Sequence, residues 1–359
     1  MSSQSVVNNP RDDSAEIRSL PCPNCFLCAT PGEPLYQGLI DRLFDAPGVW
    51  NFRRCPNCGL LWLDPMPIEE DIQKAYDRYP THAALDPVVE PHETAMLSHR
   101  AANLLRSAYR AYRFDYGDGA GKPLRRLLAV PILLTRIECD SLDIPLRYLA
   151  VPGKGRMLDV GCSDGYVLKV AEELGWNAEG VDFDPQAVAY ATRKGLKARL
   201  GRLADQHLPD DSFDLVLMSH VIEHVHHPVA TLDEIRRVLR PGGMLVVTTP
   251  NADSWGHRHF GRFWRGLEPP RHLNIFTAAN LLELASQAGF ADRTVASTLR
   301  ITEHGFVQSR LVRRTGCGEH GHTIPLRDAA CGRLAAFAES LMRLWNPLAA
   351  DELLLEARK

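Results

Sequence analysis

The sequence predicts an α/β protein built around a Rossmann-like parallel sheet, preceded by a small cysteine-rich module and a helical linker region. One observation is an apolar strand pattern at 156–160, which runs into the turn Gly161-Cys162-Ser163-Asp164-Gly165 and then into a helical pattern. Another is the alternation of strand and helix patterns after this turn, as a parallel sheet with crossover helices requires. A third is a pair of Cys-x-x-Cys sequences before residue 60, which indicates a metal-binding module.

Composition and charge limit the classes of function. The 359 residues allow one domain of typical size and a substantial accessory part. A net charge of −3 and a pI near 6.5 argue against a protein that wraps nucleic acid. Residues 1–19 lack the apolar core of a secretory signal, and 127–134, the longest uncharged apolar run, is too short to span a membrane. Nine cysteines, four of them in Cys-x-x-Cys pairs, indicate metal binding in a reducing compartment, so we expect a cytoplasmic protein.

The N-terminal part predicts a zinc ribbon. Residues 1–18 are expected to be disordered, because they offer little apolar surface to bury. The module 19–82 carries two Cys-Pro-Asn-Cys turns, which can supply four thiolates to one closed tetrahedral site. The predicted ligands of a structural zinc ion are Cys22, Cys25, Cys55 and Cys58. Cys28 forms a competing pair with Cys25, so the register of the first turn stays open.

Residues 83–150 are expected to be helical, with a glycine-rich interruption near 116–123. Between 97 and 136 there are eight Lys or Arg residues and two Asp residues, a local excess of six positive charges. This pattern indicates either a solvated helical face or a basic cradle for an anionic acceptor. Such an acceptor could be a nucleotide sugar, a polyprenyl-linked sugar or a phospholipid surface, and peripheral membrane contact through 97–136 is one expectation.

The unit 153–182 favours a ligand that carries a ribose and a positive charge. Glycines allow close approach of the backbone, and Asp182 ends the second strand 21 residues after Gly161, where a carboxylate can bind a ribose diol. The pyrophosphate fingerprint G-x-G-x-x-G is absent, and Asp159 would repel a diphosphate but attract a cation. S-adenosylmethionine has these properties. The stretch Leu158–Gly165 resembles the first motif of the class I S-adenosylmethionine-dependent methyltransferases.

The resemblance implies a seven-stranded methyltransferase sheet over 151–359, in which a last strand at 352–357 inserts antiparallel beside a sixth strand at 294–299. It implies that Asp205 contacts the adenine, and the sequence 219–225, SHVIEHV, resembles the motif that abuts the donor at the end of the fourth strand. The implied donor-binding residues are Asp159, Gly161, Cys162, Gly165, Asp182, Phe183, Asp205 and His220.

The remaining elements follow from apolar spacing and from capping residues. Strands are predicted at 215–218 and 244–249, and a helix over 186–194. A further helix is predicted to carry Leu232, Ile235 and Leu239 inward and to end at 241–243. Thr277 is the predicted N-cap of a helix that ends at Gly289.

Two insertions are predicted in the catalytic domain. The first, 251–276, has six aromatic or histidine side chains within ten positions and follows the fifth strand, over the edge of the sheet where ligands bind. We interpret it as a lid over the acceptor, although ordinary packing of the rings is the alternative. The second, 301–346, is expected to end in a helix from about 334 to 345. Its Cys317, His320 and His322 could form a second metal site, although they offer only three ligands in a glycine-rich loop.

Methyl transfer to a hydroxyl group requires two aligned substrates and a general base. His272 on the lid and His220 on the donor side are the candidate bases, and a buried structural role is the alternative for each. The segment Cys55–His82 resembles the N-terminal module of bacterial methyltransferases encoded with polysaccharide- and sugar-modifying enzymes. The leading hypothesis is therefore O-methylation of a sugar, or of a glycolipid or polysaccharide precursor.

Three other functions remain open at this point. One is a C- or N-methyltransferase acting on a nucleotide sugar or another small metabolite. Another is an RNA methyltransferase with a four-cysteine zinc module, which the acidic balance disfavours. The last is a non-catalytic binding protein, which the intact glycine turn and Asp182 disfavour.

Overall fold

The computed structural model describes residues 16–77, 93–115, 122–133, 136–144, 146–151, 154–318 and 324–359. Some sequence predictions fall outside these ranges. They concern most of the segment 1–18 that was predicted to be disordered, the end of the module from 78, most of the predicted interruption near 116–123, and two of the three residues of the second metal hypothesis, His320 and His322.

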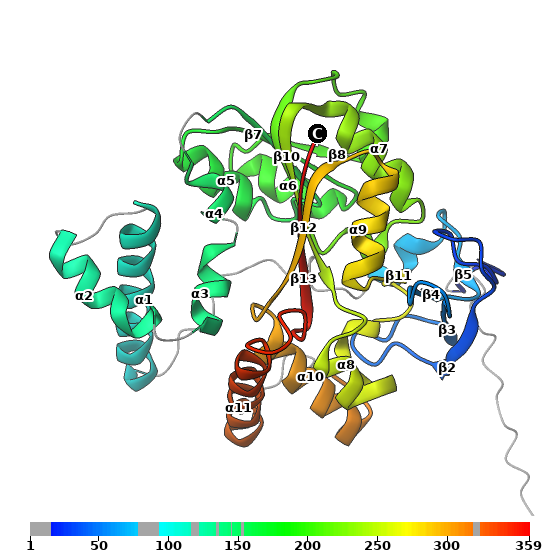
Figure 1. Ribbon diagram of the computed structural model, residues 1–359. Helices are drawn as coiled ribbons and strands as arrows, with labels where there is room; N and C mark the ends of the chain where they lie inside the picture. The colour runs from blue at the N-terminus through cyan, green and yellow to red at the C-terminus, as the bar shows by residue number, and fades with distance from the viewer. Residues whose placement is uncertain are drawn as a thin grey trace, which may run out of the picture.

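A seven-stranded sheet with the order β12-β13-β10-β9-β6-β7-β8 forms the centre of the molecule (Figure 1). Neighbouring strands from β8 to β10 run parallel, whereas β13 pairs antiparallel with both β10 and β12. The predicted mostly parallel sheet is confirmed, including its antiparallel last strand. The strands are β6 (Arg156–Val160), β7 (Asn177–Asp182), β8 (Ala198–Leu200), β9 (Phe213–Ser219), β10 (Leu239–Pro250), β12 (Ala291–Thr298) and β13 (Glu352–Arg358).

Helices cover both faces of this sheet because alternate strand residues point to opposite sides. Leu215 and Leu217 of β9 pack with α5 (Tyr166–Glu173) and α6 (Pro185–Arg193). Val216 and Met218 pack with α7 (Pro228–Val238) and α9 (Ala278–Gln287). Thr277 caps α9 as predicted, since its hydroxyl accepts a hydrogen bond from the Asn280 N–H and the Asn280 side chain accepts one from the Thr277 N–H.

The N-terminal module shares a sheet with the predicted lid. Its elements are β1 (Ser19–Leu20), β2 (Glu33–Leu39), β3 (Trp50–Arg54), β4 (Leu61–Leu63), β5 (Met66–Pro67) and the 3-10 helix η2 (Ile72–Tyr76). The four-stranded sheet has the order β11-β4-β3-β2, and β11 (Asn274–Ile275) belongs to the insertion 251–276. The rest of this insertion forms α8 (Trp255–Phe260), η6 (Gly261–Phe263) and η7 (Arg265–Leu267). The lid therefore completes the sheet of the module.

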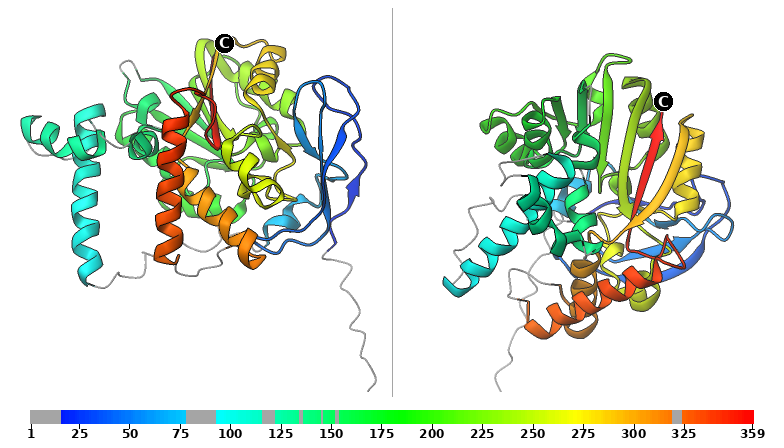
Figure 2. Two further views of the ribbon diagram at one scale, coloured as in Figure 1. Left: turned by 60° about the horizontal axis from the view of Figure 1, so that its bottom comes forward. Right: turned by 60° about the vertical axis from the view of Figure 1, so that its left-hand side comes forward.

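The remaining helices lie at the periphery (Figures 1 and 2). The expected helical segment contains α1 (Glu93–Phe114), α2 (Lys122–Leu133), α3 (Arg136–Asp143) and α4 (Leu146–Leu149), and α1 and α2 stand apart from the sheet. The second insertion contains α10 (Thr302–Thr315) and α11 (Leu326–Met342). The last helix thus begins at 326 and not near 334, directly after Pro325. Across the described parts of the chain, none of the helices combines the length and the apolar character needed to cross a bilayer.

Candidate active site

The glycine turn lies at the carboxyl end of β6, where the order of the sheet reverses between β6 and β9. Gly161 has a φ of +80°, and a Cβ there would lie 2.2 Å from Cγ2 of Val221 in the loop after β9. Gly165 also has a φ of +80°, and its Cβ would lie 2.5 Å from Cδ1 of Leu196. Both positions therefore require glycine, and the turn forms a close-packed cradle at the edge where open α/β sheets bind ligands.

Two buried carboxyl groups face this turn. Asp182 at the end of β7 accepts hydrogen bonds from the backbone N–H groups of Ser163 (2.8 Å) and Asp184 (2.9 Å), so its carboxylate is fixed to the turn. Burial and the nearby Asp182 raise the pKa of Asp159 to about 8. Among the described residues, no Lys or Arg forms an ion pair with either group. A ligand that carries a positive charge would relieve this electrostatic cost.

The other predicted donor contacts divide into rim and core positions. Phe183 is partly exposed beside Asp182, and Asp205 is exposed in the 3-10 helix η4 (Leu203–Gln206). Shortly before this helix, the Gly201 N–H donates to the Asp182 carbonyl. Phe183 and Asp205 can both border an adenine ring. The Cys162 side chain instead points into the core, where it packs against Gly180, so this residue can serve a ligand only through its backbone.

His220 follows β9 with a φ of +54° and is held by two carboxylates. Its Nδ1 lies 3.0 Å from Oε1 of Glu223, and its Nε2 lies 2.6 Å from Oε1 of Glu352. Although burial acts against the charged form, the hydrogen bonds and charges of these two groups raise the pKa of His220 to about 9. An imidazolium that donates from both nitrogens cannot accept a proton, so the geometry favours a charged anchor over a base.

His272 is buried and holds the opposite protonation state. Its Nδ1 lies 2.7 Å from the carbonyl oxygen of Gly266, which can only accept, so Nδ1 carries the proton and Nε2 carries the lone pair. Burial and the neighbouring His224 hold the pKa of His272 well below its ordinary value. The imidazole is therefore neutral near pH 7 and has the form that a general base needs.

His224 is a second neutral imidazole and was not among the residues predicted from the sequence. Its Nδ1 lies 2.9 Å from the carbonyl oxygen of Arg271, and burial lowers its pKa. The ring centroids of His224 and His272 are 4.8 Å apart. The available signal was the adjacent pair Glu223-His224 inside the recognised motif.

The N-terminal module contributes directly to this cluster. The Tyr76 hydroxyl lies 3.1 Å from Nδ1 of His224, and the Tyr76 ring meets Phe183 edge-on with centroids 5.0 Å apart. The buried Arg271 guanidinium pairs with Asp41 (2.8 Å) and donates to the Ala75 carbonyl (2.8 Å). The module therefore forms one wall of the site.

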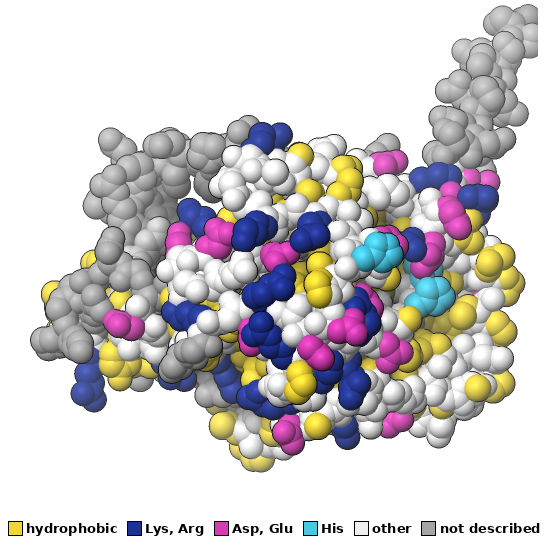
Figure 3. Space-filling view, turned by 90° about the horizontal axis from the view of Figure 1, so that it is seen from above, with side chains coloured by type: hydrophobic (Ala, Val, Ile, Leu, Met, Phe, Trp, Pro, Cys, Tyr) yellow, Lys and Arg dark blue, Asp and Glu magenta, His cyan; other side chains and the backbone are white. Residues whose placement is uncertain are grey.

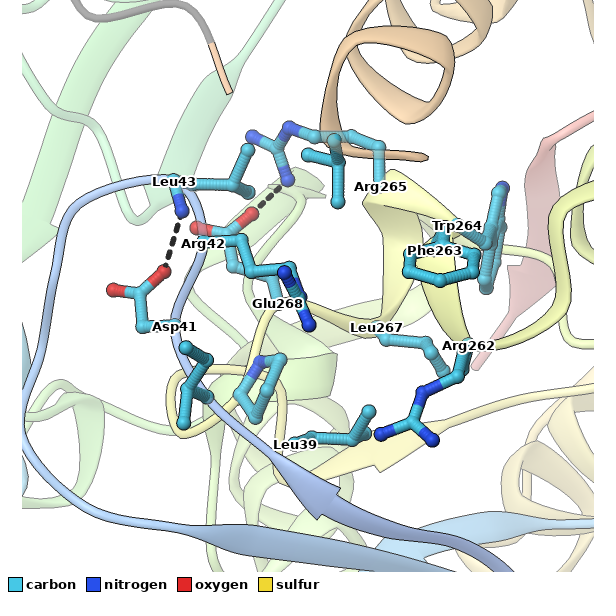
Figure 4. A pocket seen from close by; sticks show the side chains of 13 residues that line it. Leu39, Asp41, Arg42, Leu43, Arg262, Phe263, Trp264, Arg265, Leu267 and Glu268 are labelled. Carbon is cyan, nitrogen blue, oxygen red and sulfur yellow. Dashed lines mark hydrogen bonds and ion pairs between the residues drawn. The ribbon is translucent and has the colours of Figure 1, made fainter. Parts of the chain in front are cut away.

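Most rings of the predicted lid pack against one another or against Phe306 of α10. Trp255 stacks on Phe306 of α10 with centroids 5.9 Å apart, and His257 stacks on Trp264 with centroids 4.8 Å apart. Where the lid meets the module at residues 39–43, only a cavity of about 30 Å³ remains, enough for about one water molecule (Figure 4). The contacts thus favour ordinary packing for these rings, whereas His272 faces the His224 ring.

Four cysteines form a group that could hold a metal ion: Cys25, Cys28, Cys55 and Cys58. The Sγ–Sγ distances are 3.6 Å for Cys25–Cys58, 3.4 Å for Cys28–Cys55 and 4.0 Å for Cys28–Cys58. A tetrahedral site with bonds of about 2.3 Å has edges of about 3.8 Å. The donor set therefore fits a closed tetrahedral zinc site.

The predicted ligand Cys22 is corrected to Cys28. In each turn the residue after the second cysteine has a positive φ, +55° at Ala29 and +78° at Gly59. Pairing Cys22 with Cys25 would impose this conformation on the bulky Phe26, which is unfavourable. Cys22 is held elsewhere, since its N–H donates to Asp64 and its carbonyl accepts from the Trp62 indole.

A second group in the described chain could also hold a divalent ion. Glu223, His224 and His272 each offer one ligand atom, and these atoms lie within 4.8 Å of one another. The Glu223 carboxylate is already engaged with His220 and with the Thr249 hydroxyl.

Several known proteins that resemble this chain are methyltransferases, and the region that matches their family contains strands β6 to β10 of the central sheet. A family described as a methyltransferase domain matches residues 135–295. A probable S-adenosylmethionine-dependent methyltransferase of Mycolicibacterium smegmatis is 34% identical over 180 residues, which cover 48% of this chain and 65% of the relative. A ubiquinone biosynthesis O-methyltransferase of Bradyrhizobium is 32% identical over 209 residues, 49% of this chain and 80% of the relative. A malonyl-[acyl-carrier protein] O-methyltransferase of Serratia marcescens is 30% identical over 139 residues, 38% of this chain and 53% of the relative.

Among solved structures, a SAM-dependent methyltransferase from Archaeoglobus fulgidus aligns with a TM-score of 0.43 and 20% identity, over 65% of this chain and 99% of that one. The chain spans 65% and 53% of the first two curated relatives, and so leaves a third to a half of their length unmatched.

Proposed function

Because the chain belongs to the family of S-adenosylmethionine-dependent methyltransferases, we propose that it methylates a hydroxyl oxygen of a sugar, or of a glycolipid or polysaccharide precursor. The observation that carries the choice of oxygen is the pair of neutral imidazoles, His224 and His272, in the candidate site. A hydroxyl group must lose a proton when it is methylated, and a neutral histidine can take it.

The donor-binding half of the site suits S-adenosylmethionine, which supplies a methyl group on a positively charged sulfur. Asp182 would hold the ribose diol, and the adenine would lie at the rim formed by Phe183 and Asp205. Asp159 would carry its negative charge beside the positive sulfur, whereas without a cation burial and Asp182 raise its pKa to about 8. The backbone of the Gly161–Gly165 turn allows close approach.

Within this proposal the histidines have different roles. His272 acts as the base through Nε2, because Gly266 fixes its proton on Nδ1. His224 lies beside it in the same tautomer, fixed by the Arg271 carbonyl and adjoined by the Tyr76 hydroxyl. His220 remains charged between Glu223 and Glu352 and orders the loop after β9.

The acceptor class rests on other support. The resemblance of Cys55–His82 to modules of sugar-modifying methyltransferases favours a sugar. Two of the relatives described above are named O-methyltransferases, which supports oxygen as the methylated atom, although their named substrates are not sugars. A C- or N-methyltransferase on a nucleotide sugar or other small metabolite is the second candidate. RNA is disfavoured by the net charge of −3 and by the mixture of Lys, Arg, Asp and Glu on the face in Figure 3.

The test is incubation of the purified protein with labelled S-adenosylmethionine and a panel of acceptors. The panel contains nucleotide sugars, lipid-linked sugars, a demethylated quinol, a malonyl carrier-protein thioester and RNA. Label in a sugar product, located on oxygen by NMR, is the expected result. Label on carbon or nitrogen, or only in RNA, would overturn the proposal.

Two further parts of the proposal concern the module and the helical arm. The four-cysteine group Cys25, Cys28, Cys55 and Cys58 holds one structural zinc ion. The arm formed by α1 and α2 contacts a membrane surface or a lipid-linked acceptor, since it exposes apolar Leu104, Leu124 and Leu127 together with Arg113 and Arg126. Sedimentation with anionic vesicles, which should weaken in a Leu127→Glu variant, tests the second statement.

A further inference from the structure

The helix α11 and the turn after it expose their large apolar side chains. Leu334 is 69% exposed, Phe337 59% and Trp345 82%. Leu334, Phe337 and Leu341 recur at i, i+3 and i+7 and so share one face of α11, and Leu344 and Trp345 follow in the turn after the helix. We call this exposed apolar set the stripe. The full stripe consists of Leu326, Leu334, Phe337, Leu341, Leu344 and Trp345.

The opposite face of α11 is small and acidic, and it is the face that packs inward. Gly332 lies so close to α10 that a Cβ there would come within 2.7 Å of Cγ2 of Val307. The buried Glu339 accepts a hydrogen bond from the Thr302 hydroxyl (2.7 Å), and the buried Asp328 pairs with Arg310 (2.9 Å). These contacts fix the rotation of the helix, so the stripe cannot turn inward without breaking them. Figure 2 shows α11 on the outside of the molecule beside α10.

The size of the stripe matches a protein interface. Typical areas of these side chains give roughly 800 Å² of exposed apolar surface, more than the largest patch of an ordinary monomer. One partner of a standard, stable interface contributes about 800 Å². A surface of this size and composition is therefore expected to be covered in solution.

The charges around the stripe favour a protein partner over a lipid surface. A helix that binds anionic lipid presents cations on its polar face. Here the inward face of α11 is packed against the protein, and two arginines at its edge are paired with carboxylates: Arg333 with Glu303 (3.6 Å), and Arg343, directly after the helix, with Asp140 (2.7 Å). Arg327 is exposed and lies near the Asp328 carboxylate. A rim that carries both signs of charge is complementary to a second copy of itself.

We propose that α11 and the turn through Trp345 form the interface of a homodimer, in which the stripe of one chain packs against the stripe of another. A two-fold contact of this kind buries both stripes at once and leaves no unpaired apolar surface to propagate a chain of molecules. The interface lies on α11 and not on the catalytic histidines, so donor binding does not depend on it.

The experiment is sedimentation equilibrium and light scattering on the 359-residue protein, purified with zinc. The expected mass is that of two chains, and a Leu334→Glu/Phe337→Glu variant should have the mass of one chain at concentrations where the wild type is dimeric. Because both side chains are largely exposed, the circular dichroism spectrum of the variant should be unchanged. Its melting temperature should equal that of wild-type protein diluted below the dimer dissociation constant, where the wild type is monomeric.

A matched control substitutes an exposed apolar residue of the N-terminal module, Val49→Glu, and should remain dimeric. A wild-type protein that is monomeric at about 100 μM, well above typical dimer dissociation constants, would overturn the proposal. So would a double variant that stays dimeric, or a control that dissociates as the double variant does. If the wild type is monomeric and binds anionic vesicles, and the double variant does not bind them, the stripe is a membrane-binding surface instead.

Discussion

The choice between Cys22 and Cys28 as the fourth metal ligand gives the sharpest test of the structure. Cys28→Ser removes one member of the group whose sulfurs lie 3.4–4.0 Å apart, whereas Cys22→Ser leaves all four in place. A zinc ion bound by four thiolates contributes about 10–16 kcal/mol to the folding of a small zinc domain. A quarter of that contribution is about 3 kcal/mol, or about a hundredfold in metal affinity.

The assay is the zinc content of the two variants, measured by elemental analysis after dialysis against a chelator of intermediate affinity. We expect one zinc per chain in the wild type and in Cys22→Ser, and much less in Cys28→Ser. Loss of zinc should also lower turnover, because the second turn leads into β4, which pairs with β11 directly after His272. The reasoning fails if Cys22→Ser loses zinc as readily as Cys28→Ser, or if both variants keep it.

Three other outcomes are expected. Asp182→Ala should weaken S-adenosylmethionine binding by about 1.5–3 kcal/mol, the range for a hydrogen bond to a charged group, and unchanged affinity in calorimetry would refute the ribose assignment. His272→Gln should lower turnover by about 10²-fold with donor affinity intact, as loss of a general base does, whereas lost donor affinity would place His272 in the donor pocket. For His220 the folded-state pKa of about 9 lies above the ordinary 6.5, so its stabilisation is complete below pH 6.5 and disappears as pH rises through 9. Chemical denaturation across pH 6–9.5 should show that the free energy of unfolding falls with rising pH in the wild type but not in His220→Gln. The same pH dependence in both proteins would contradict this.

The donor half of the site was predictable because its residues are close in sequence. Gly161, Gly165 and Asp182 lie within one strand-turn-helix-strand unit, and their spacing follows from the geometry of a parallel crossover. The sheet was predictable for a similar reason, since each strand has its own apolar pattern and its own flanking turn. The prediction was wrong where two overlapping cysteine pairs competed: Cys22–Cys25 repeats the letters of Cys55–Cys58, but the backbone after the second cysteine favours Cys25–Cys28.

The acceptor half could not be derived in the same way, because its contacts join distant segments. The Tyr76 hydroxyl reaches His224 across 148 positions of sequence, and Arg271 pairs with Asp41 across 230. No periodicity or spacing encodes such a pair. Sequence reasoning could name His272 from the composition of the lid, but it could not show that the module supplies the opposite wall.

The aromatic density of 251–276 has a physical explanation in this arrangement. The insertion leaves the main sheet and must bury a core of its own, which it shares with the N-terminal module: Trp264 and Phe260 pack with Phe52 and Leu39. Rings supply much buried area for few residues, so a short segment that joins two sheets is expected to be rich in them. The lid is therefore held rigidly by the module. Tyr76→Phe keeps the ring against Phe183 but removes the hydroxyl beside His224. This variant should lower turnover about tenfold and shift the acidic limb of the pH profile of turnover. The matched substitution Tyr36→Phe, beside His257, should leave that limb in place. Equal profiles for the two variants would return Tyr76 to a packing role.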